Sequence, residues 1–291
     1  MDCLPLKFRV MVVALGLGLA GCQSGDSGAD AAASEEPVEQ CSRVEPSHLS
    51  VITEAWFGRI EDGVSKGADL DGDGPNCGHA DYIDPEGNAG IDNAFGGLLP
   101  LLDLTEFTAV EVYLQDTINW GELLLMIEME DVDSIEEDPC VNVNLLRGLG
   151  EPTVGTDKII ESGQTFDRDL DLPMSRSEGM AIADGRLIAR PLNLPLPVQY
   201  FDDNLTINFQ EGVLQHDIGE DGHGTGFLAG GVRSQDIIDF VDGRGDIDVG
   251  DLLIDLLGTY SDVWPDENGE CKGFSAVLEF KTKPAFFYLD E

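Results

Sequence analysis

Three aspartates alternate along residues 69–74, which read Asp-Leu-Asp-Gly-Asp-Gly. A turn with this spacing directs several carboxylates at one point, and calcium prefers about six to eight oxygen ligands. Without a cation, like charges this close would repel one another. The pattern therefore predicts a calcium site whose ligands are the aspartates of this acidic segment: Asp69, Asp71, Asp73, Asp81, Asp84 and Asp92.

The acidic segment departs from a standard EF-hand. The twelfth position of that calcium loop is a bidentate Glu, and here it is Ala80. The segment is more similar to the Asp-rich calcium loops of thrombospondin type-3 and related extracellular repeats, where such runs recur near a cysteine, as Cys77 does here. This resemblance implies a calcium ion that stabilises an extracellular fold. The alternative is a solvated acidic loop in a chain that is acidic throughout.

Other clusters are weaker candidates. Residues 262–271 resemble the first acidic segment, because they also place oxygen donors beside a glycine and a cysteine, Cys271. Residues 222–230 resemble the histidine motif of subtilisin-like proteases, but the second histidine is replaced by Gly226 and no serine segment follows, so we interpret them as a hairpin turn. His216 and His223, with nearby acids, are candidate transition-metal ligands or exposed turn residues. We assign no catalytic residue.

The charge of the chain excludes several partners. There are 57 Asp and Glu against 16 Lys and Arg, which gives a formal net charge of −41. Nucleic acids and anionic lipid headgroups are recognised by clustered basic side chains, whereas the basic residues here are scattered. We therefore expect no nucleic-acid partner.

Residues 1–21 have the pattern of an export signal. A short basic region precedes the apolar run from Val10 to Gly21, which is shorter than the about 20 residues that a membrane-spanning helix needs. The run ends in Leu19-Ala20-Gly21-Cys22, which resembles the lipobox of bacterial lipoproteins at all its positions. The resemblance implies cleavage before Cys22 and lipidation of its sulfur, and several acyl chains give a stable membrane anchor.

The residues after the signal predict a tethered domain. Residues 22–40 contain mostly Ser, Ala, Gly and acids, so we expect a disordered acidic tether followed by one β-rich domain over 41–291. Gln23 stands where many inner-membrane lipoproteins carry Asp, which implies an outer-membrane lipoprotein of the cell envelope. The runs at 84–93 and 265–271 are similar to acidic secreted lipoproteins of myxobacterial type, a resemblance that implies no particular activity.

Four cysteines remain after the leader and the lipid site are set aside: Cys41, Cys77, Cys140 and Cys271. An even number in an exported protein predicts disulfides. A zinc site is the alternative, although zinc ligands usually include closely spaced cysteine pairs. The pairing stays open among three connectivities.

Strands must position the acidic segment. Apolar and polar residues alternate at 204–210, 213–218, 226–232 and 274–280, and 122–129 has the pattern of a central strand. Asp184-Gly185 predicts a hairpin turn, and Glu211-Gly212 predicts a turn between the strands at 204–210 and 213–218. Prolines restrict 192–198 to a sheet edge.

Helices are fewer, with short ones expected at 105–121, 234–240 and 249–257, the first capped by Thr105 and the last by Asp248. Together these elements predict a mainly β protein, an antiparallel β-sandwich-like domain with a few short helices.

The sequence therefore favours a lipid-anchored, calcium-stabilised binding or structural module. The alternative is a secreted hydrolase that acts on carbohydrate through Asp and Glu side chains. The surface ligand, the membrane face and the oligomeric state are left open.

Overall fold

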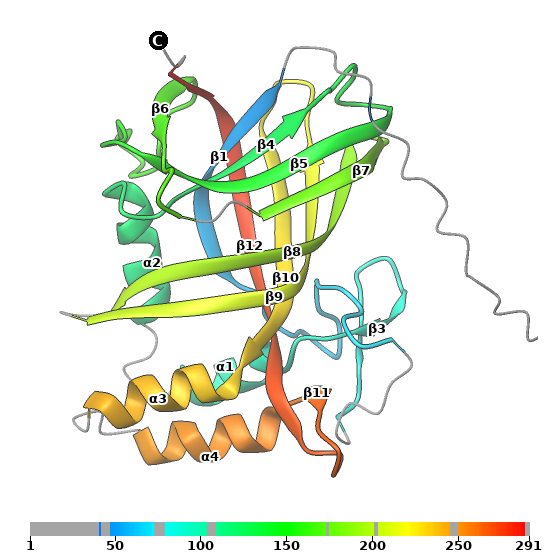
Figure 1. Cartoon of the computed structure of the whole chain (residues 1–291), viewed down its shortest axis with the longest axis vertical. Helices are drawn as coiled ribbons and strands as arrows, with labels where there is room; N and C mark the ends of the chain where they lie inside the picture. The colour runs from blue at the N-terminus through cyan, green and yellow to red at the C-terminus, as the bar shows by residue number, and fades with distance from the viewer. Residues whose placement is uncertain are drawn as a thin grey trace, which may run out of the picture. The chain divides into compact units, whose positions relative to one another are not determined.

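Eight antiparallel strands close into a barrel (Figure 1). Each strand pairs with the next barrel strand along the chain, and the last pairs with the first, as Phe57 does with Leu278. The barrel strands are β1 (His48–Phe57), β4 (Leu124–Glu130), β5 (Asp138–Leu149), β7 (Ser175–Ala183), β8 (Arg186–Tyr200), β9 (Asp203–Ile218), β10 (Gly224–Arg233) and β12 (Cys271–Phe287). The mainly β prediction is confirmed, but the sandwich-like arrangement is wrong, because the β1–β12 pairing closes the sheet.

The computed structural model describes residues 41, 47–72, 79–103, 109–172, 175–200, 203–244 and 250–288. The predicted signal, Cys22 and the tether lie outside these residues, as do Asp73 and Cys77. Residues 38–291 belong to one structural unit.

Smaller strands are added to the barrel. The strand β6 (Gln164–Arg168) pairs with the ends of both β5 and β12. Another short strand, β11 (Val263–Pro265), pairs with β12. A separate two-stranded sheet joins β2 (Tyr82–Ile83) to β3 (Ala89–Ile91), directly after the acidic segment.

The two faces of β12 pack against different partners. Phe274, Ala276, Leu278 and Phe280 alternate along the strand and belong to the main apolar core. Val277 lies on the opposite face and packs with Phe227 and Ala229 of β10 in a second, small cluster. Ala68 and Leu70 of the acidic segment pack on that small cluster, so the wall of the barrel anchors the acidic segment.

Four helices accompany the described strands: α1 (Ala94–Leu102), α2 (Ala109–Asn119), α3 (Ser234–Arg244) and α4 (Gly250–Tyr260). The three predicted helices correspond to α2, α3 and α4, although the caps expected at Thr105 and Asp248 lie outside the described residues. Helix α1 was not predicted, because it contains two glycines and Pro100. No helix in the described ranges is long and apolar enough to cross a membrane.

The predicted hairpins are largely confirmed. Asp184 and Gly185 both have positive φ angles and connect β7 to β8. The expected turn at 211–212 is wrong, since β9 continues through an irregularity there, with Glu211 at a φ of 54°. The proline-containing half of β8 pairs only with β9 in the described register, as expected of an edge.

One predicted disulfide joins Cys41 to Cys140, whose Cα atoms are 5.3 Å apart. Cys271 is disulfide-bonded as well. The Cys41–Cys140 bond ties the chain ahead of β1 to β5 across a sequence separation of 99 residues.

Candidate metal centre

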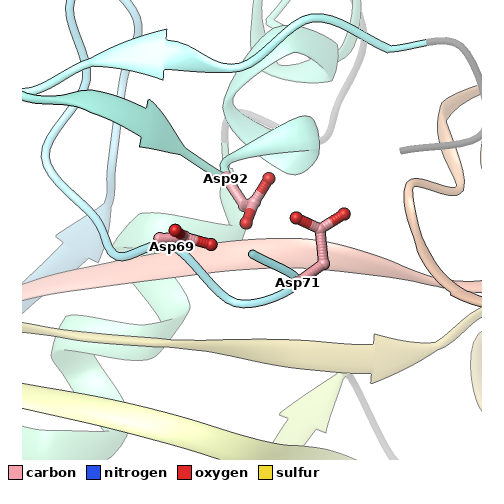
Figure 2. Close-up of side chains that lie close together, drawn as sticks. All are labelled: Asp69, Asp71 and Asp92. Atoms are coloured by element: carbon pink, nitrogen blue, oxygen red, sulfur yellow. The ribbon is translucent and has the colours of Figure 1, made fainter. Parts of the chain in front are cut away.

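Three aspartates from two segments converge beside the barrel wall. Figure 2 shows the carboxylates of Asp69, Asp71 and Asp92 gathered in one space. One oxygen from each lies within 4.8 Å of the others. Asp69 and Asp71 belong to the acidic segment, and Asp92 follows β3, so the group joins residues that are more than 20 positions apart in the sequence.

Apolar anchoring explains why Asp69 and Asp71 share a side. Leu70 lies between them and packs on Phe227, Ala229 and Val277. The chain bends at Leu70 and Asp71, so packing of Leu70 on the barrel leaves the carboxylates on either side of it to lie together away from the wall.

Backbone hydrogen bonds hold the two segments together. Asp92 N donates to Ala68 O at 3.1 Å, and Leu70 N donates to Asp92 Oδ2 at 2.7 Å. Gly72 N donates to Asp69 Oδ1 at 2.6 Å. The carboxylates of Asp69 and Asp92 are therefore positioned by the main chain before any ion binds.

The residue after Asp92 fixes that segment to α1. Asn93 Oδ1 accepts a hydrogen bond from Gly96 N and caps the helix, while its Nδ2 donates to Gly58 O and Ser65 Oγ. Asn93 is 1% exposed. A helix N-terminus carries a partial positive charge, which favours the nearby acids.

A fourth acid, Asp262, approaches from the end of α4. Its two oxygens accept hydrogen bonds from Ser275 N and Ser275 Oγ, at 2.7 Å and 2.5 Å. Ser275 Oγ in turn accepts from Ala94 N of α1. The sequence analysis placed Asp262 in the separate group at 262–271, and only the fold brings it to the first acidic segment.

The acids of this group have raised pKa values. Burial raises the pKa of Asp92 to about 7, with further increases from the charges of Asp71, Asp262 and Asp81, against the hydrogen bond from Leu70. Burial and the neighbouring charges likewise raise the pKa of Asp71 to about 6. Burial also raises the pKa of Asp262.

Among the described residues, His79 is the basic side chain whose charge acts on Asp262 and lowers its pKa, against the effect of burial. No Lys or Arg among the described residues forms an ion pair with Asp69, Asp71 or Asp92. A divalent cation would relieve the repulsion, and the three carboxylates supply hard oxygen ligands of the kind that calcium prefers.

The other predicted ligands are placed differently. Asp81 is exposed, and its charge raises the pKa of both Asp71 and Asp92. Asp84 lies outside the group and accepts hydrogen bonds from Asn88 N and Nδ2 in the turn between β2 and β3. Asp73 lies outside the described residues.

The two other candidate clusters form no shared acidic site in the described residues. Asp266 accepts hydrogen bonds from Asn268 N and Glu270 N, and an ion pair with Lys272 lowers its pKa to about 2. The expectation of an exposed turn is wrong for His216, because this residue is fully buried on β9, and Asp217 beside it pairs with Arg186. His223 lies in the exposed turn between β9 and β10.

A cavity of about 370 Å³ opens beside Asp92. It is bordered by the small β2–β3 sheet, the start of α1 and the end of α4. Its lining is acidic, aromatic and aliphatic, and consists of Gly63, His79, Ala80, Asp81, Tyr82, Ile83, Ile91, Asp92, Asn93, Ala94, Tyr260 and Asp262 among the described residues.

No family model matches this chain, and neither a curated protein nor a solved structure matches it. The function is therefore argued from the site itself.

Proposed function

We propose that this protein is a lipid-anchored, calcium-stabilised binding or structural module of the bacterial outer membrane, with no catalytic role. The convergence of Asp69, Asp71 and Asp92 is the observation that carries the calcium part. Burial and the charges of neighbouring acids raise the pKa values of Asp71 and Asp92, and a divalent cation would relieve that repulsion between the ionised carboxylates.

Calcium would act here as a cross-link. The acidic segment packs on the barrel wall through Leu70, and Asp92 precedes α1. An ion shared by these segments joins the barrel surface to the small β2–β3 sheet and to α1. Because the ion binds the folded arrangement only, it stabilises the fold by mass action.

Thermal melting with calcium and with a chelator tests the calcium site. Calcium should raise the melting temperature of the wild type, and Asp71→Asn should remove most of that rise. Asp62→Asn is the matched control, since Asp62 is an exposed aspartate of a nearby turn with a positive φ that Asn tolerates. A melting temperature that changes with neither calcium nor chelator would contradict the calcium site.

The lipid anchor rests on the sequence Leu19-Ala20-Gly21-Cys22. Palmitate labelling of the full chain in a bacterial host should mark the wild type and should be lost in Cys22→Ser. Cys3→Ser is the control, because Cys3 belongs to the predicted leader. Labelling that survives in Cys22→Ser would reject the anchor.

A secreted hydrolase is the second candidate, favoured by the cavity beside Asp92. A carboxyl with a pKa of about 7 suits a general acid at neutral pH. Against it, the oxygens of Asp69, Asp71 and Asp92 lie within 4.8 Å of one another, closer than the about 6.5–9.5 Å by which an inverting glycosidase separates its carboxyls to admit a water. Hydrolysis of chromogenic glycosides that Asp92→Asn abolishes would favour the hydrolase.

A further inference from the structure

The walls of the cavity beside Asp92 differ in chemistry. Asp81, Asp92 and Asp262 bring three carboxyl groups to it, and Asp92 and Asp262 are only 3% and 4% exposed. Ile83, Ile91 and Ala94 contribute an aliphatic wall. Pockets that bind small molecules commonly combine apolar walls with a few convergent polar groups.

Two tyrosines complete the lining. The ring of Tyr260 stacks with that of His79, with centroids 6.1 Å apart and planes inclined by 23°. Tyr82 and Asp262 both line the cavity, where burial raises the pKa of Tyr82 and the charge of Asp262 raises it further. Aromatic faces attract cations, so the rings and the carboxyls favour the same sign of ligand charge.

A metal ion alone does not account for this cavity. Its volume of about 370 Å³ far exceeds the space that one metal-bound water molecule would occupy. The aliphatic wall gives no oxygen to a cation and no hydrogen bond to water. A ligand that satisfies all the walls needs a positive end and an apolar body.

We propose that this cavity binds an aliphatic amine in its ammonium form. The ammonium group donates up to three hydrogen bonds, which suits the carboxyls of Asp81, Asp92 and Asp262. The alkyl chain packs on Ile83 and Ile91. No Lys or Arg of the described ranges lines the cavity, and the basic side chain that does so is His79, whose charge acts on Asp262.

The ligand class deepens the binding role proposed above, and it is separable from the calcium site. Five acids are grouped here: Asp69, Asp71, Asp81, Asp92 and Asp262. One calcium ion neutralises two of the five negative charges, which leaves three. Asp92 belongs to both sites, so calcium should weaken amine binding without abolishing it.

Titration calorimetry of the full chain with n-pentylamine tests the proposal. Experiments at physiological ionic strength limit long-range attraction to the acidic surface, because the Debye length is then about 8 Å. We expect saturable binding that Asp81→Asn weakens about tenfold through loss of a charge-assisted contact. Tyr82→Leu should weaken binding about threefold through loss of the aromatic face.

Two controls separate the cavity from general electrostatics. Glu86→Gln removes one charge from the neighbouring turn outside the cavity and should leave n-pentylamine affinity within about twofold. The neutral 1-pentanol should bind about tenfold more weakly than the amine, because it lacks the positive charge.

Each contrary result overturns the proposal. Equal binding of 1-pentanol would show that only the aliphatic wall matters. Unchanged affinity in both Asp81→Asn and Tyr82→Leu would place the amine elsewhere, and tetramethylammonium that binds as tightly would exclude hydrogen-bond donation. Failure of the calcium site would give a different result: calcium would leave the melting temperature unchanged, while n-pentylamine would still bind.

Discussion

The backbone N–H of Leu70 donates a 2.7 Å hydrogen bond to Asp92 Oδ2 and links the acidic segment to the residue that precedes α1 by two positions. The Leu70 side chain packs on the barrel wall. One residue therefore fixes both the depth of the acidic segment and the orientation of the buried carboxylate, so that an arriving cation need not order either.

Calcium affinity should fall as the pH is lowered. Asp92 and Asp71 have pKa values raised to about 7 and about 6, and only their deprotonated forms bind calcium. Calcium binding near pH 6.5 should therefore release protons. Titration calorimetry in two buffers with different ionisation enthalpies measures that release, and Asp71→Asn should reduce it. Identical heats in both buffers would contradict the expectation.

Without calcium, mild acid should stabilise the fold. The pKa of Asp92 rises from its ordinary value of 3.8 to about 7 on folding, so the native state binds a proton more tightly than the unfolded state. This stabilisation is complete below about pH 4 and is lost as the pH rises through 7. Urea unfolding in chelator should show a larger free energy of unfolding at pH 5.5 than at pH 8. Asp92→Asn, which keeps an acceptor for Leu70, should flatten the difference.

The sequence predicted most strands but not how the sheet closes. The alternation in 274–280 marks β12 correctly, because one face of that strand belongs to the main core. The same alternation is expected of a sandwich and of a barrel. The pairing of Phe57 with Leu278 decides between them, and contacts between residues so far apart leave no local pattern.

The site was predicted in part for a similar reason. The acidic composition and the spacing of Asp69 and Asp71 are local signals, and Asp92 follows close behind. Asp262 arrives from the far end of the chain, and its hydrogen bonds to Ser275 are formed only in the fold. The aspartate at position 84 was included by composition, although a turn with Asn88 engages its carboxylate.

A glycine inside the barrel should be intolerant of a side chain. A Cβ at Gly226 would lie 2.7 Å from the Phe280 ring and would also clash with Gln215 O. Gly226→Ala should therefore destabilise the protein by about 1–3 kcal/mol through overpacking, measured by urea unfolding. Gly243→Ala in α3 is the control, since nothing lies within 4 Å of its Cβ position. Equal stability of the two variants would contradict the packing described here.

The Cys41–Cys140 disulfide should contribute substantially to stability. It closes a sequence separation of 99 residues, and bonds that close long loops restrict the unfolded chain, typically by about 2–4 kcal/mol. The double variant Cys41→Ser/Cys140→Ser should lose a free energy of unfolding of about that size under oxidising conditions. Wild-type stability in the double variant would show that the bond contributes nothing.

A buried histidine should make the barrel sensitive to acid. His216 is 0% exposed, with Nε2 2.8 Å from Thr282 Oγ1 and no hydrogen-bond partner for Nδ1 among the described residues. Its ring lies 5.9 Å from that of Phe280. Burial lowers its pKa from 6.5 to about 4, and the nearby charge of His48 lowers it further, against the opposite effect of Asp217.

The sign of the pH effect follows from that lowered pKa. Between about pH 6.5 and pH 4 the unfolded state binds a proton that the native His216 resists, so this part of the stability is present above pH 6.5 and is lost on acidification. The loss should reach about 3 kcal/mol. His216→Leu removes the titration, so the wild type should lose that much more free energy of unfolding than this variant between pH 7.5 and pH 4. His223→Leu alters an exposed turn histidine and should follow the wild type; a wild type that tracks His216→Leu at every pH would contradict the burial described for this imidazole.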